Sequence, residues 1–239
     1  MKKILFLSIG IMILLFGIYL RVFILKEPTT PKQLTQTREF TVVHSIDEQR
    51  FGQASMGPND PTTGASTGET TCTNNVNWGT PTGAAAQDTS YATITGNNLD
   101  TNEYTDELEL SGYGFTTSGT IDGVLVEVIG WSVAGGGSTI VDVRMMTASL
   151  TYLGTDKATG TLGTSDPGTT YTGYGGAADS WSSGVTSTQV NAAGFGVALC
   201  YRAVGDNTNI SIDHVRITVT YTAAVGGETP VMPIIIQGE

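Results

Sequence analysis

Short stretches in which apolar and polar residues alternate dominate the chain after residue 76, and glycine-rich segments separate them. Such two-residue periodicity is typical of β-strands that bury one face. The pattern predicts an all-β domain over residues 76–222, folded as a single antiparallel β-sandwich that is jelly-roll-like. The expected strands cover residues 91–95, 107–110, 123–131, 139–150, 195–203 and 210–221.

The last two predicted strands give the most detailed expectations. In 195–203, large side chains alternate with a small-residue face that includes Cys200 and leaves room for a covering segment. In 210–221, the apolar residues Ile212 and Val215 are three positions apart. Both can face the core only if the strand is irregular between them, so we predict a β-bulge near Asp213 and His214.

An uncharged, mostly apolar run of 17 residues extends from Ile4 to Leu20. As a helix it is about 25 Å long, and continuing past Arg21 brings it close to the roughly 30 Å of a bilayer core. Residues 1–26 are therefore expected to form a transmembrane anchor that holds the β-domain outside the cytoplasm, at the cell surface or in the periplasm. The alternative is a signal peptide, although no small-x-small cleavage site follows the run.

Segments with weaker patterns flank the predicted domain. Residues 27–75 begin with Pro, Thr and Gln and are expected to form a flexible stalk, with one strand-like segment at 39–46. Residues 52–75 lack apolar periodicity and are expected to be loose. The tail, 223–239, contains an apolar run that can pair as an edge strand of this protein or of a neighbouring copy.

Composition narrows the range of partners. The chain has a net charge of −11 and 31 glycines, and its basic residues form no cluster. A nucleic-acid partner is therefore not expected, because phosphate neutralisation requires clustered Lys and Arg. The acidic surface is instead expected to keep an exposed domain soluble.

The sequence offers little catalytic machinery. Only His44 and His214 could act as a histidine base, and they lie far apart in the predicted order of elements. Ser132 follows Gly130-Trp as in a nucleophile elbow, but glycines follow it where the elbow needs a helix. We therefore expect no enzymatic activity.

Two glutamates offer a weaker candidate. Glu107 and Glu109 share one face of a predicted strand, an arrangement that resembles the carboxylate pair of a glycosidase. The simpler interpretation, which we adopt, is an ordinary solvated face. No calcium-loop motif or zinc-ligand spacing is present, so neither a metal nor another cofactor is expected.

Cys72 and Cys200 are the two cysteines of the chain and are 128 positions apart. Outside the cytoplasm they could form a disulfide. Closing a loop of this length would stabilise the fold by roughly 4–5 kcal/mol on the chain-entropy model. A buried thiol beside an unrelated flexible one is the other interpretation, and the sequence leaves both open.

One long loop, 154–187, is rich in aromatic residues and glycines. Its candidate ligand-binding residues are Tyr171, Tyr174, Asp179 and Trp181. Aromatic rings can stack on sugar rings, and a carboxylate can accept hydrogen bonds from sugar hydroxyls. The alternative, which we favour, is that these rings cap one end of the sandwich; Trp78 and Trp131 are expected to be core or edge residues.

Several short motifs carry a family resemblance over roughly 60% of the chain, about residues 78–221. They are Asp88-Thr-Ser-Tyr-Ala-Thr, Gly114-Phe, Gly119-Thr-Ile-Asp-Gly-Val, Asp156-Lys-Ala, Tyr174-Gly-Gly with Asp179-Ser-Trp181, Val190-Asn-Ala-Ala-Gly-Phe-Gly-Val, and the segment from Ile212 to Tyr221. The region resembles a jelly-roll-type domain that recurs in bacteriophage virion and tail-associated proteins and in bacterial surface proteins. The resemblance implies a structural or adhesive module and transfers no catalytic residue.

These expectations combine into a functional hypothesis. The anchor and stalk depart from a virion component and favour a cellular surface protein. We expect a non-enzymatic, membrane-anchored module for adhesion or surface structure, with surface glycans or neighbouring copies as partners. Two alternatives are a carbohydrate-binding module that uses the loop around Trp181 and a filament subunit that assembles by strand complementation.

Overall fold

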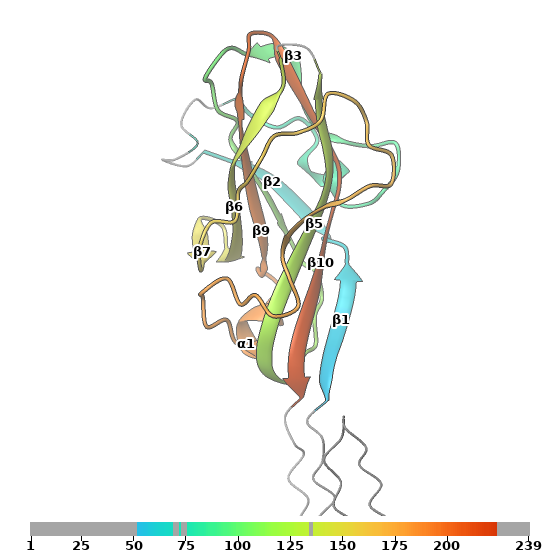
Figure 1. The fold of residues 1–239 in the computed structure, drawn as a ribbon, viewed down its shortest axis with the longest axis vertical. Coiled ribbons are helices and arrows are strands. Elements are labelled where there is room, and N and C mark those ends of the chain that lie inside the picture. Colours follow the sequence, from blue (N-terminus) through green and yellow to red (C-terminus); the bar gives the residue numbers. More distant parts are fainter. Residues whose placement is uncertain (1–51, 69–71, 73–75, 134–135, 224–239) are drawn as a thin grey trace, which may run out of the picture. The chain divides into compact units, whose positions relative to one another are not determined.

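The computed structural model of the chain describes residues 52–68, 72, 76–133 and 136–223. Two antiparallel five-stranded sheets dominate this part, which confirms the expected all-β class (Figure 1). The predicted anchor at 1–26, the strand at 39–46 and the tail beyond residue 223 lie outside the described residues and stay predictions. None of the helices described here has both the length and the hydrophobicity to cross a bilayer.

The first sheet, sheet A, is organised around two long partners. Strand β10 (Thr208–Ala223) pairs with β5 (Gly119–Val133) over almost its full length. On its other side, β10 pairs with β1 (Gln53–Asn59) near its end and with β3 (Ala92–Leu99) near its start. The short strand β8 (Thr172–Gly175) pairs with the other side of β5.

The second sheet, sheet B, has the strand order β2-β4-β9-β6-β7. Its strands are β2 (Thr63–Thr67), β4 (Glu107–Ser111), β9 (Gly196–Ala203), β6 (Ser138–Ala148) and β7 (Thr151–Leu153). The 3-10 helix η1 (Pro81–Ala84) and the α-helix α1 (Ser187–Val190) connect strands of the two sheets. The strand expected at 139–150 corresponds to β6, which ends at Ala148; residues 149–150 form the tight turn between β6 and β7.

The hydrophobic core lies between the sheets and draws on both, as in a β-sandwich. Its members alternate along each strand, as the period of two requires. They include Ile94, Leu108, Val126, Val143, Leu199, Val215 and Ile217, all at most 2% exposed. Trp78 also belongs to this core, and its indole nitrogen donates a hydrogen bond to the Asp106 carbonyl at 2.8 Å.

The expectation that residues 52–75 are loose is wrong for the part that the structure describes. Strands β1 and β2 lie within that range and pair with β10 and β4. Their sequences lack apolar alternation because they lie at sheet edges, where most of their side chains are exposed or half-buried. Backbone hydrogen bonds to an existing strand form them, and these bonds leave no hydrophobic pattern in the sequence.

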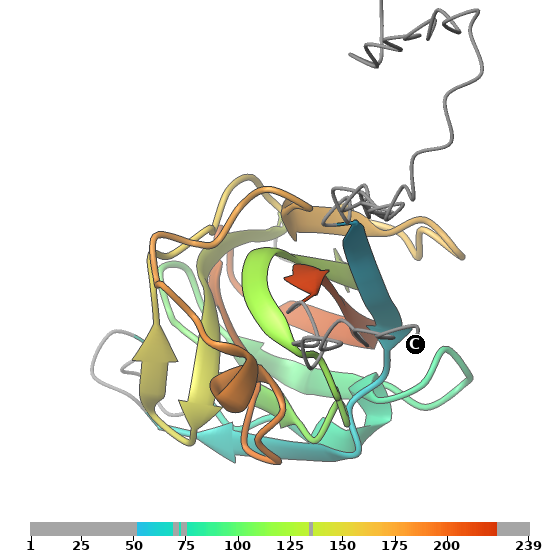
Figure 2. The same cartoon turned by 90° about the horizontal axis from the view of Figure 1, so that it is seen from below.

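The two ends of the described domain lie side by side. Gln53 at the start of β1 pairs with Thr222 near the end of β10 (Figure 2). The β5–β6 and β9–β10 connections lie at the opposite end, where the Val204 amide donates to the Gly137 carbonyl at 3.1 Å. The chain therefore enters and leaves this domain at one end, and connections between the two sheets occupy the other.

Candidate functional site

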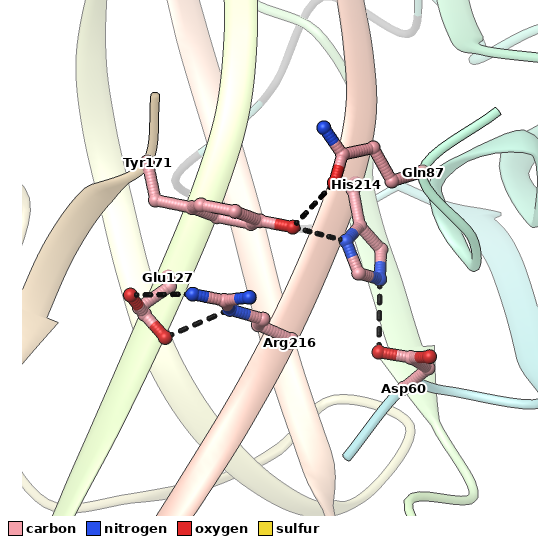
Figure 3. A network of polar contacts seen from close by, with 6 residues as sticks. All are labelled: Asp60, Gln87, Glu127, Tyr171, His214 and Arg216. Carbon is pink, nitrogen blue, oxygen red and sulfur yellow. Dashed lines mark hydrogen bonds and ion pairs between the residues drawn. The ribbon is translucent and has the colours of Figure 1, made fainter. Parts of the chain in front are cut away.

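A group of polar side chains gathers on the outer face of sheet A, and we call it the outer polar network. Its members are Asp60, Gln87, Glu127, Tyr171, His214 and Arg216 (Figure 3). They come from five segments: the end of β1, the connection after η1, β5, the segment before β8, and β10. The network therefore joins loops far apart in the sequence to the two central strands of sheet A.

The predicted bulge positions two of these residues. The pairing of β10 with β5 changes register between Ile212 and His214, as expected. Ile212 and Val215 both stay in the core, and the extra residue between them turns His214 and Arg216 to the outer face. A regular strand could not hold this histidine outside while keeping both apolar neighbours inside.

His214 lies between a carboxylate and a phenol. Its Nε2 is 3.0 Å from Asp60 Oδ1, and its Nδ1 is 2.7 Å from the Tyr171 hydroxyl. The Tyr171 hydroxyl also lies 3.3 Å from Gln87 Oε1. A neutral imidazole would accept a hydrogen bond from the Tyr171 hydroxyl and donate one to Asp60. An imidazolium would donate hydrogen bonds to both groups. The imidazole can be hydrogen-bonded in either charge state.

Arg216 contacts the face of the Tyr171 ring. The guanidinium makes two hydrogen bonds to the Glu127 carboxylate, at 2.9 and 3.1 Å, directly across the β10–β5 ladder. Its Cζ also lies 3.7 Å from the centre of the Tyr171 ring. This bidentate pair beneath an aromatic ring fixes the position of Arg216 and attaches the loop before β8 to the sheet.

The order carboxylate, imidazole, hydroxyl matches that of a nucleophile triad, but the phenol is poorly suited to that role. Burial is the largest influence on the pKa of Tyr171 and raises it, although Arg216 opposes the shift. The hydroxyl therefore stays protonated at neutral pH and serves as a hydrogen-bonding group. Asp60 keeps 58% of its side chain exposed and Gln87 is exposed, so the rim of the network can meet a polar ligand.

The aromatic loop does not present its rings as predicted for ligand binding. Trp181 is fully buried, and Tyr174 is 4% exposed. The indole nitrogen of Trp181 donates to the Val124 carbonyl at 2.9 Å. A Cβ at Gly175, whose φ is +77°, would lie 2.4 Å from that nitrogen, which explains one glycine of the cluster. Trp181 and Tyr174 belong to the hydrophobic core, so their role is structural.

The other two predicted ligand-binding residues, Tyr171 and Asp179, have different partners. Tyr171 joins the outer polar network, whereas Asp179 pairs with Lys157 at 2.9 Å. The hydrogen bond from Lys157 is the main cause that lowers the pKa of Asp179. Asp179 also accepts the backbone amide of Trp181 at 2.8 Å. The structure therefore does not bring the four predicted residues into one binding surface.

The cysteines are paired on the outer face of sheet B. Cys72 and Cys200 form a disulfide, and both residues are fully buried. The small-residue face of β9 leaves room for Cys72, as expected. A glycine is needed on the same face, because a Cβ at Gly196 would lie 1.9 Å from the Leu110 carbonyl oxygen.

The prediction that Glu107 and Glu109 lie on a solvated face is wrong. Glu107 is fully buried and Glu109 is 4% exposed. The Tyr152 hydroxyl donates to Glu107, and Glu109 accepts hydrogen bonds from the Leu150 amide at 2.9 Å and the Thr67 hydroxyl at 3.0 Å. The β6–β7 hairpin and strand β2 supply these donors, so both faces of sheet B are covered here. The alternation of apolar and polar residues along β4 therefore does not show which side chains are exposed.

Sequence reasoning missed most of the outer polar network. Asp60 lies in the segment expected to be loose, and Glu127 and Arg216 read as ordinary outward residues of strands. The sequence feature that could have indicated the network was the predicted bulge, because it required His214, next to Asp213, to point away from the core. Ser132, considered as a nucleophile, is buried within β5, away from any strand-to-helix turn.

Comparisons with known proteins add no family. No family model matches the chain, and a search of curated proteins gives no match either. The two antiparallel sheets agree with the fold of the virion and surface domains that the motifs resemble, but nothing beyond the fold links the chain to them. Among the described residues, no group of three or more His, Cys, Asp or Glu side chains is arranged to hold a metal ion.

Proposed function

We propose that the protein is a non-enzymatic, membrane-anchored cell-surface module for adhesion or surface structure, with a jelly-roll-like sandwich displayed outside the cytoplasm. The observation that carries the proposal is the common end of β1 and β10. A domain attached at one end leaves the loops at its opposite end free to meet a partner. The buried disulfide also suits an oxidising compartment.

The interactions within the outer polar network support a non-catalytic role. Arg216 is engaged by Glu127 and by the Tyr171 ring, and His214 is engaged on both nitrogens. Burial also raises the pKa of the Tyr171 phenol, the one hydroxyl of the network, away from the values that suit a nucleophile. The network attaches loops to sheet A and leaves Asp60 and Gln87 at its rim.

Membrane fractionation tests the display. The full chain is expressed in a bacterial host, and protease is added to intact cells and to spheroplasts. We expect the protein in the membrane fraction and cleavage from outside in one or both preparations. A variant that lacks residues 1–26 is the control and should leave the membrane fraction. Full-length protein that is soluble, or protected in both preparations, would contradict the proposal.

A carbohydrate-binding module remains the second candidate, with its site moved from Trp181 to the rim of the outer polar network. Half-buried Tyr171 lies beside exposed Gln87 and Asp60, and such polar groups can bind sugar hydroxyls. The test is a glycan array with wild type and with Gln87→Ala. Asp206→Asn, at the far end of β10, is the control. Equal binding by all three proteins, or no binding by any, would remove this candidate.

A filament subunit is the third candidate. In the described part of the chain, β1 pairs with β10 on one side, and no other described strand pairs with it. Its seven residues carry no charge, and charge is a common device that blocks edge pairing. An ectodomain that stays monomeric at high concentration in light scattering would exclude this assembly.

A further inference from the structure

One side of the sandwich is closed by a segment that we call the side strap, residues 154–163. It continues from β7 along the edge of β6 and then reaches sheet A. The Lys157 amide donates to the Val143 carbonyl at 3.0 Å, and the Ile140 amide donates to the Gly160 carbonyl at 3.2 Å. The Ser132 amide of β5 donates to the Gly163 carbonyl at 2.8 Å. The side strap therefore joins the edges of both sheets.

A carboxylate, Asp156, fastens the first part of the side strap. Its Oδ1 accepts the backbone amide of Val143 on β6 at 2.9 Å and that of Ala158 within the side strap at 2.8 Å. Nearby, the Thr155 amide donates to the Trp181 carbonyl at 2.7 Å. A side chain thus occupies a position on the β6 edge where the carbonyl of another strand would usually accept.

Behind Asp156 lies a second carboxyl, that of Asp142 on β6, with no exposed surface. Its Oδ1 forms an ion pair with Arg144 Nε at 2.8 Å, and among the described residues neither carboxyl oxygen of Asp142 has a hydrogen-bond partner. The Asp156 carboxyl accepts the backbone amide of Val143, the residue next to Asp142, so two charged carboxylates here would repel each other, and a buried carboxyl without a hydrogen-bond donor favours the protonated form. The exposed Asp156 keeps its charge more easily, so the proton resides on Asp142.

We propose that the proton on Asp142 is a pH-sensitive latch, which holds the side strap against β6 while it is present and loosens the strap when it is lost. Deprotonation places two negative carboxylates side by side at the point where Asp156 binds the β6 backbone. The side strap is then expected to open locally. Its opening uncovers the edge of β6 and the contact with Trp181, while the two sheets stay paired.

The charged groups around Asp142 set the direction of this response. Burial is the largest influence and, together with Asp156 and Glu107, raises the pKa of Asp142 to about 7 against the opposing Arg144. From the neighbouring elements, Tyr152 of β7 donates to Glu107, and Lys157 of the side strap is paired with Asp179. Glu109 of β4 and Arg202 of β9 also lie on the outer face of sheet B.

The pH range of the latch follows from linkage. The closed state favours the protonated carboxyl, with a pKa of about 7 instead of the ordinary value near 4. Closure is therefore most stable in acid, below pH 4, and is lost as pH rises. The opening equilibrium should increase by up to about tenfold per pH unit between pH 4 and 7 and level off above that range.

Hydrogen exchange read by mass spectrometry tests the latch on the described domain within the full chain. After correction for intrinsic exchange, peptides covering the side strap should lose protection as pH rises from 5 to 8, roughly 100-fold at most. Peptides from β5 and β10 should not follow this change. Asp142→Asn is expected to abolish the dependence, because the amide does not titrate and stays neutral beside Asp156. Asp206→Asn, the same substitution in the connection between β9 and β10, should retain it.

A carboxyl titration by ¹³C NMR separates coupling from burial. The Asp142 carboxyl should titrate near pH 7 in the wild type and at lower pH in Asp156→Asn, where the second carboxyl is neutral. An Asp142 midpoint near 4 would overturn the proposal. Equal strap protection profiles in wild type and Asp142→Asn, or an unchanged midpoint in Asp156→Asn, would do so as well. Neither outcome bears on surface display, which the fractionation experiment tests separately.

Discussion

The outer faces of the two sheets differ in how they accommodate charged side chains. On sheet A, Arg216 and Glu127 pair directly across adjacent strands and remain partly exposed. On sheet B, Glu107 and Asp142 lie on either side of Cys200 and are fully buried, and Arg144 is the cation that contacts Asp142. An exposed face can keep matched charges in water, whereas a covered face must satisfy its acids with hydrogen bonds or retain a proton.

The disulfide is the strongest test of the covered face. Replacing both cysteines by serine should lower the free energy of unfolding by about 4–5 kcal/mol, because a cross-link over 128 residues restricts the unfolded chain. Urea denaturation of wild type and double variant measures the change. Reducing the wild type with dithiothreitol in urea should reproduce it. A loss below about 1 kcal/mol would mean that the cover of sheet B is held by its other contacts.

The pH dependence of stability sharpens the contrast between the faces. Because the folded state raises the pKa of Asp142 to about 7, the wild type should lose stability as pH rises from about 4 to 7, on the order of 2–3 kcal/mol. Asp142→Asn should lack this component. Denaturant midpoints at matched ionic strength measure both proteins. Parallel curves for the two proteins would show that Asp142 titrates alike in the folded and unfolded states.

On the open face, Arg216→Ala should destabilise the fold by about 2 kcal/mol. The substitution removes the bidentate partner of Glu127 and the cation beneath the Tyr171 ring. Arg216→Lys keeps the charge but loses the planar pair, so it should fall between wild type and alanine. Thermal unfolding of the three proteins provides the ranking. If lysine and wild type are equal, the bidentate geometry contributes nothing.

The smallest expected effect concerns the hydroxyl of Tyr171. Tyr171→Phe keeps the ring over Arg216 and removes the hydrogen bond to His214 Nδ1, which should cost about 1 kcal/mol. Tyr91→Phe is a suitable control, because Tyr91 packs edge-on against Trp131 on the same sheet. Chemical denaturation compares the two variants. A cost equal to that of the control would show that the phenol–imidazole contact is energetically neutral.

Periodicity predicted the parts of the fold that bury one face and leave the other exposed. The strands near the core and the bulge between Ile212 and Val215 follow from that rule. It failed for Glu107, because a second layer covers that face, and for β1, because an edge strand can form through its backbone alone. The outer polar network needed the tertiary fold, since Asp60 and His214 are 154 residues apart.

The adjacency of Gln53 and Thr222 has a consequence for how this domain can be reused. A domain whose first and last strands are neighbours can be inserted into an exposed turn of a host protein without separating the two ends of that turn. Residues 53–223 would form such a cassette, since they contain both sheets and the disulfide. The same geometry makes the unit easy to shuffle among unrelated carriers during evolution.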